Sequence, residues 1–121
     1  MAAKKSRTKA LRPRFRILQG DEIALGPGKA DLLAQVAETG SIAEAAKRMD
    51  MSYMRAWTLI RTMNGCFKEP LVESARGGAI GGGARLTETG TRVLALYQQM
   101  QEKSMVATRK TWLELSRLLD G

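Results

Sequence analysis

The 121-residue sequence contains no histidine and a single cysteine. Histidine is the commonest general base and the commonest metal ligand in proteins, so its absence argues against most acid–base enzymes and most metal sites. The lone Cys66 leaves too few thiolates for a structural zinc site and no partner for an internal disulfide. We therefore expect no enzymatic activity, no cofactor and no bound metal.

Long hydrophobic runs are also absent. No apolar stretch approaches the roughly 18 residues that a membrane-spanning helix needs. The N-terminus lacks the apolar segment of a secretory signal peptide. These absences predict a soluble cytoplasmic protein without a membrane partner, and the length allows one domain with a modest core.

Positive charge is in excess, at a net +8, and it is unevenly distributed. Residues 1–16 contain seven bases and no acid, and residues 47–92 contain eight bases against four acids. The stretch between them is net acidic. Two basic zones of this kind favour a polyanionic partner such as double-stranded DNA, whose phosphates bind Lys and Arg whatever the base sequence.

The stretch 41–65 has the pattern of two short helices separated by a tight turn. Ser41 and Glu44 form an S-x-x-E capping box, in which each side chain bonds the other residue's backbone N–H, and it starts the first helix at residue 42. Ser52 caps a second helix, which Gly65 is expected to end in the left-handed conformation. From this pattern alone, the pair is either a DNA-binding helix-turn-helix or an ordinary helical hairpin.

The second helix has two unlike faces. At 100° per residue, Ala56, Ile60 and Met63 form an inward apolar stripe. We expect Trp57, which lies beside this stripe, to pack in the core. The opposite face combines arginine with small hydroxyls and can enter a major groove; it carries Met54, Thr58, Arg61 and Thr62.

A glycine-rich loop lies between two short predicted strands, 71–75 and 85–87. Placed after a recognition helix, this hairpin would be a wing, with Arg76 and Arg85 reaching flanking phosphates or a minor groove. The loop lacks the G-x-x-x-x-G-K-[ST] pattern of a nucleotide-binding loop. Upstream, the pattern predicts strands at 14–18 and 22–25 and a helix at 29–38.

The last predicted element is a long helix that starts after Thr87, its N-cap. It either runs unbroken to about Leu119 or is interrupted near Thr108. In both cases it is longer than the body before it can cover, so its surplus apolar face predicts a homodimer.

These elements predict a mainly α fold with a small β wing, namely a winged helix-turn-helix with a long C-terminal dimerisation helix. We divide the chain into a basic flexible arm at 1–13, a winged helix-turn-helix domain at 14–87 and the long helix at 88–121.

Several motifs from Gly40 to Gly90 resemble the N-terminal DNA-binding domain of the family of molybdate-responsive transcriptional regulators called ModE, itself similar to the winged helix-turn-helix of LysR-type regulators. The matching stretches are Gly40-Ser41-Ile42, Ser52-Tyr53, Ala56-Trp57, Met63-Asn64, Leu71-Val72-Glu73, Gly77-Gly78, Gly81-Gly82-Gly83-Ala84, Leu86-Thr87 and Gly90.

The resemblance implies a homodimer on a palindromic operator, with DNA contacts from the wing and from Ser52, Tyr53, Arg55 and Thr58. Members that sense molybdate carry C-terminal oxyanion-binding domains, and this sequence ends at Gly121, so we expect no direct molybdate site in it. Together with the helical wheel and the charge distribution, the candidate DNA-binding residues are Lys47, Arg48, Ser52, Tyr53, Met54, Arg55, Thr58, Arg61, Arg76 and Arg85.

The function predicted from the sequence is a sequence-specific DNA-binding transcriptional regulator of the ModE type, with residues 52–64 in the major groove and residues 71–87 on the backbone or minor groove. Two alternatives stay open: a sequence-indifferent architectural DNA-binding protein, and an interaction module for a molybdenum-handling partner. The operator, the target genes and the sign of regulation do not follow from the sequence.

Overall fold

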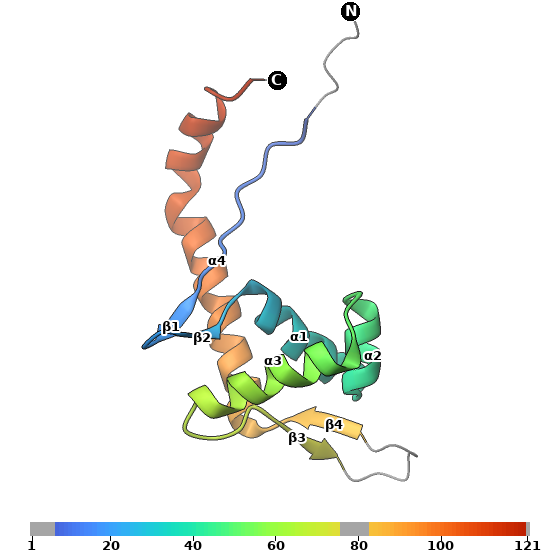
Figure 1. Cartoon of the computed structure of the whole chain (residues 1–121). Coiled ribbons are helices and arrows are strands. Elements are labelled where there is room, and N and C mark those ends of the chain that lie inside the picture. The colour runs from blue at the N-terminus through green and yellow to red at the C-terminus, as the bar shows by residue number, and fades with distance from the viewer. Residues whose placement is uncertain (1–6, 76–82, 121) are drawn as a thin grey trace, which may run out of the picture.

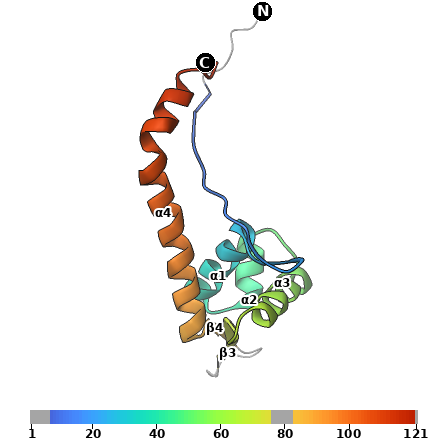
Figure 2. The same ribbon diagram turned by 90° about the vertical axis from the view of Figure 1, so that its left-hand side faces the viewer.

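The computed structural model describes residues 7–75 and 83–120 of the chain. Its helices α1 (Pro27–Thr39), α2 (Ile42–Arg48) and α3 (Tyr53–Cys66) gather at one end of the long helix α4 (Glu88–Ser116), and the rest of α4 extends away from this body (Figures 1 and 2). The predicted winged helix-turn-helix is confirmed. The elements in order are β1 Ile17–Gln19, β2 Glu22–Leu25, α1 Pro27–Thr39, α2 Ile42–Arg48, α3 Tyr53–Cys66, β3 Val72–Ala75, β4 Gly83–Leu86 and α4 Glu88–Ser116.

Both predicted N-caps of the helix pair are present. The Ser41 hydroxyl oxygen accepts a hydrogen bond from the Glu44 backbone N–H at 3.1 Å, and the Ser52 hydroxyl oxygen accepts one from the Arg55 N–H at 3.1 Å. The reciprocal half of the predicted capping box is wrong. The Ser41 N–H donates to the Thr39 hydroxyl instead, because the tight α1–α2 turn brings that hydroxyl within 3.2 Å.

The ends of the helices differ from the prediction in one respect. Gly40 takes the left-handed conformation after α1, and Asp50 does so in the turn between α2 and α3. Gly65 does not, and α3 continues through it to Cys66. Phe67, which packs against the core in an extended conformation, takes the chain out of the helix, so Gly65 is not the stop signal.

The core lies where the helices cross. Each of α1, α2 and α3 buries an apolar face there, and on α3 this face is the predicted stripe of Ala56, Ile60 and Met63. Tyr97 of α4 is buried against them, and its hydroxyl donates to the Phe15 carbonyl at 2.8 Å. Burial raises the pKa of the Tyr97 phenol above its usual value, and the nearby charge of Asp31 adds to this rise.

The N-terminal hairpin is shorter than predicted. β1 begins only at Ile17 and pairs antiparallel with β2, whereas the prediction began the strand at residue 14. The preceding residues leave the hairpin because their backbone bonds to α4 instead, through the Tyr97–Phe15 bond and a 3.4 Å bond from the Gln101 side-chain amide to the Pro13 carbonyl.

The wing is an antiparallel pair of β3 and β4, in register from Val72 opposite Leu86 to Ala75 opposite Gly83. The connecting loop, with Arg76, lies outside the described residues. Asn64 of α3 ties the wing to the helix: its side-chain oxygen accepts from the Leu71 and Val72 N–H groups at 2.8 and 3.2 Å, and its amide nitrogen donates to the Val72 carbonyl at 3.2 Å.

Helix α4 is continuous past Thr108 to Ser116, which answers the question that the sequence pattern left open. The predicted Thr87 cap is present, with its hydroxyl oxygen accepting from the Gly90 N–H at 2.9 Å. A Cβ atom at Gly90 would lie 2.0 Å from the Leu71 carbonyl oxygen. Only glycine therefore allows α4 to start this close to the Leu71 backbone, which leads directly into β3.

Candidate nucleic-acid interface

The first two turns of α3 present a row of side chains to solvent. Because Ala56, Ile60 and Met63 point inward, the remaining faces of the helix are left free. Met54 is 70% exposed, and the predicted contact residues on this helix are all exposed, namely Ser52, Tyr53, Met54, Arg55, Thr58 and Arg61. The structure thus brings six of the ten candidate residues together on one helix.

These side chains keep hydrogen-bonding capacity for a partner. The Thr58 hydroxyl donates to the Met54 carbonyl at 2.9 Å, which leaves its oxygen able to accept. The Ser52 oxygen accepts the capping bond, which leaves its O–H able to donate. Within residues 7–75 and 83–120, no ion pair involves Arg55. Its guanidinium is therefore available to a base or a phosphate.

The two basic residues at the end of α2 are not equivalent. The Arg48 guanidinium lies 3.1 Å from the Glu38 carboxylate and 3.2 Å from the Gln35 side-chain oxygen, both on α1. Lys47 is exposed and forms no ion pair within the described part of the chain. Of these two candidates, Lys47 has the freer charge and Arg48 joins α2 to α1.

The wing also contains a basic side chain, Arg85, that forms an ion pair. Arg85 and Glu73 face each other across the two strands, and the Arg85 Nε lies 3.0 Å from the Glu73 carboxylate. The charge of Arg85 is therefore balanced in the free protein. This pairing does not follow from the strand prediction, because it depends on the register of the hairpin.

Trp57 contradicts the sequence prediction. It is 39% exposed rather than packed in the core, because it lies at the edge of the inward stripe, where the wing stands away from α3. With Tyr53, it lines a groove of about 430 Å³ between α3 and the wing. The Arg61 guanidinium carbon lies 5.9 Å from the centre of the Trp57 ring. The i, i+4, i+8 spacing of Tyr53, Trp57 and Arg61 is the signal that sequence reasoning missed.

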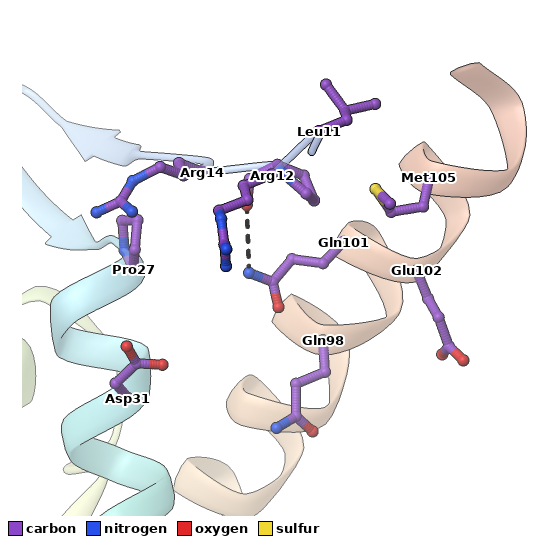
Figure 3. Close-up of a pocket in the computed structure, with 10 residues that line it drawn as sticks. Leu11, Arg12, Arg14, Pro27, Asp31, Gln98, Gln101, Glu102 and Met105 are labelled. Carbon is purple, nitrogen blue, oxygen red and sulfur yellow. Dashed lines mark hydrogen bonds between the residues drawn. The ribbon is translucent and has the colours of Figure 1, made fainter. Parts of the chain in front are cut away.

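The described part of the basic arm runs along the distal half of α4, away from α3 and the wing (Figures 1 and 2). Arg7 lies 3.6 Å from Asp120 near the end of the chain. A hollow of about 550 Å³ lies between the arm, the start of α1 and α4, and it is lined among others by Arg12, Arg14 and Glu102 (Figure 3). These bases therefore do not join the surface formed by α3.

Two further features are absent from residues 7–75 and 83–120. No helix there is both long and apolar enough to cross a membrane. The same residues contain no cluster of three or more His, Cys, Asp or Glu side chains that could hold a metal ion.

The comparisons with known proteins point to the same helices. Residues 29–91, which span α1 to the start of α4, match the model of the bacterial regulatory helix-turn-helix proteins of the lysR family. Among solved structures, the complex of the CbnR DNA-binding domain with DNA aligns with a TM-score of 0.57 and 22% identity over 73% of this chain and 95% of that one. This likeness shows a shared fold.

The curated relatives are more similar in sequence. The transcriptional regulator ModE of Yersinia pestis is 42% identical over 96 residues, which cover 77% of this chain and 36% of the relative. The DNA-binding transcriptional dual regulator ModE of Escherichia coli (strain K12) is 43% identical over 81 residues, which cover 64% of this chain and 31% of the relative. The chain thus spans about a third of the length of these relatives.

Proposed function

The chain belongs to the LysR family of bacterial regulatory helix-turn-helix proteins, and from this we propose that it is a sequence-specific DNA-binding transcriptional regulator of the ModE type. In this proposal, α3 enters the major groove and the wing contacts the backbone or the minor groove. The observation that carries it is the exposed row on α3, which begins at the capped N-terminus of the helix and combines a free arginine with hydroxyls and a methionine.

Each part of this row has a chemistry suited to DNA. The major groove of B-DNA is about 12 Å wide and admits an α-helix. Arg55 can donate two hydrogen bonds to guanine, and Met54 and the Thr58 methyl can pack on a thymine methyl. Tyr53 and Ser52, at the start of the helix, can donate to phosphate oxygens. Lys47 adds a phosphate contact from the end of α2.

The same proposal includes a homodimer formed through α4. The support is an apolar surface on this helix that the body leaves exposed. Val106 and Leu113 are seven residues apart and so lie on one face of α4. The exposed apolar side chains of the helix and its C-terminal extension are Leu96, Met100, Met105, Val106, Leu113, Leu115, Leu118 and Leu119. A twofold pairing of such helices would place two copies of α3 on half-sites about one turn of DNA apart.

Sedimentation equilibrium tests the dimer. We expect the double substitution Val106→Glu and Leu113→Glu to give a monomer, because it would place charges inside the paired surface. The matched control is Thr111→Glu, which adds a charge at an exposed position on the opposite side of the same helix. Equal association of both variants would contradict the pairing.

Selection of bound duplexes from a random pool, at near-physiological salt, tests the whole proposal. We expect a motif with twofold symmetry. Tight, salt-sensitive binding without any motif would contradict it and favour a sequence-indifferent architectural protein. Repeating the selection with molybdate tests the expectation that this chain holds no molybdate site, for which the motif and the affinity should stay the same.

A further inference from the structure

We propose that the groove between α3 and the wing binds one strand's sugar–phosphate backbone, with Trp57 packed against a deoxyribose and Arg61 on the adjoining phosphate. This inference rests on the proposed function, because it assumes that α3 faces DNA. It adds a contact that the predicted site lacked, since Trp57 was expected in the core.

The shape of the groove suits an extended chain with a flat apolar surface along it. One wall is formed by the aromatic rings of Tyr53 and Trp57, and the other by small wing residues such as Ser74 and Ala84. Because these wing residues are small, their side chains leave space between the two walls, and the groove has a volume of about 430 Å³. The start of α2, at residues 41–43, also lines the groove.

The charges around the groove favour an anionic occupant. The Arg61 guanidinium lies against the Trp57 ring, 5.9 Å from its centre, and so stands at the border of the groove. Glu73 is the acidic residue of the lining, and its carboxylate is balanced by Arg85 at 3.0 Å. Among the residues that the structure describes, the border thus offers Arg61 to a phosphate, and the carboxylate of the lining, Glu73, is already paired with Arg85.

The position of the groove next to the exposed side chains of α3 also indicates that its occupant is DNA. Tyr53 belongs both to the groove and to the predicted DNA-binding residues of the helix. A strand whose bases face Arg55 and Thr58 would pass its backbone along the neighbouring side of α3, where Trp57 lies. A half-exposed indole packs well against a deoxyribose, and its face holds the Arg61 cation in place for the phosphate.

Four variants test the ionic and the packing contacts together: Arg61→Ala, Trp57→Ala, the double variant of these two, and Trp57→Phe. We expect Arg61→Ala to weaken binding about 10-fold to specific and random duplexes alike. It should also reduce the slope of log affinity against log salt concentration by about one phosphate contact. Because the two side chains act together, their losses should not add. The affinity of the double variant should be at most about threefold lower than that of the weaker-binding single variant. Trp57→Phe should restore most of the loss seen in Trp57→Ala.

The matched control is Arg109→Ala, which removes one positive charge from the distal part of α4 and should leave the salt slope unchanged. Circular dichroism checks that each variant is folded. The emission of Trp57, read in a Trp112→Phe background, should be quenched or shifted when the duplex binds.

Unchanged Trp57 emission on a duplex that binds specifically would overturn the groove contact and leave the proposed function standing. An unchanged salt slope for Arg61→Ala would have the same meaning. Absence of any sequence-specific binding by the wild-type protein would instead overturn the proposed function itself.

Discussion

Replacing Asn64 by alanine should detach the wing from α3. The side chain makes three hydrogen bonds to the backbone of Leu71 and Val72, with donor–acceptor distances of 2.8, 3.2 and 3.2 Å. Each such bond contributes about 1 kcal/mol net, so their loss should lower the free energy of unfolding by about 3 kcal/mol. The Leu71 and Val72 residues are buried, so water cannot readily replace the lost partner.

Urea unfolding followed by circular dichroism at 222 nm measures this loss as a lower midpoint with an unchanged slope. The matched control is Thr62→Ala on the same helix, whose hydroxyl bonds only to the Thr58 carbonyl of that helix, so its loss should stay within about 0.5 kcal/mol. The reasoning would be refuted if Asn64→Ala unfolded within about 0.5 kcal/mol of the wild type, a difference typical of a neutral surface substitution.

Three further substitutions test other contacts. Gly90→Ala should destabilise the fold by more than about 3 kcal/mol, because its Cβ would lie 2.0 Å from the Leu71 carbonyl oxygen; a near-normal urea midpoint would show that α4 can shift. Tyr97→Phe should cost about 1 kcal/mol at pH 7 through the lost bond to Phe15. Because burial raises the Tyr97 pKa, the wild type should lose stability above about pH 10, where the unfolded phenol ionises first, and Tyr97→Phe should lose less; parallel curves would contradict this. Ser41→Ala should cost about 1 kcal/mol through the lost α2 cap, whereas Ser41→Asp, which can still cap, should cost little; equal losses would count against the cap.

The helix pair could be predicted from the sequence because its signals are local. The Ser41 and Ser52 caps and the stripe of Ala56, Ile60 and Met63 depend only on residues within a few positions, and the structure has all of them. The end of α3 was predicted two residues early, at residue 64 instead of Cys66, because Gly65 only permits a helix to stop. The actual end depends on Phe67 packing against a distant core.

The remaining features depend on how elements meet in space. Trp57 lies at the edge of an apolar stripe, and whether it is covered depends on where the wing stands. The Glu73–Arg85 pair requires the hairpin register, and the role of Gly90 requires the approach of Leu71. The path of the arm along α4 has no local signal, because its hydrogen bonds join residues more than 80 positions apart in the sequence.

The most direct test of the central claim compares Arg55→Ala with Lys47→Ala on a selected duplex and on random duplexes. If α3 reads bases, Arg55→Ala should weaken binding to the selected duplex by about 1–3 kcal/mol and change random binding far less, so the specificity ratio falls. Lys47→Ala, a proposed phosphate contact, should weaken both alike. An equal loss on both duplexes for Arg55→Ala would contradict the assignment of α3 as the recognition helix.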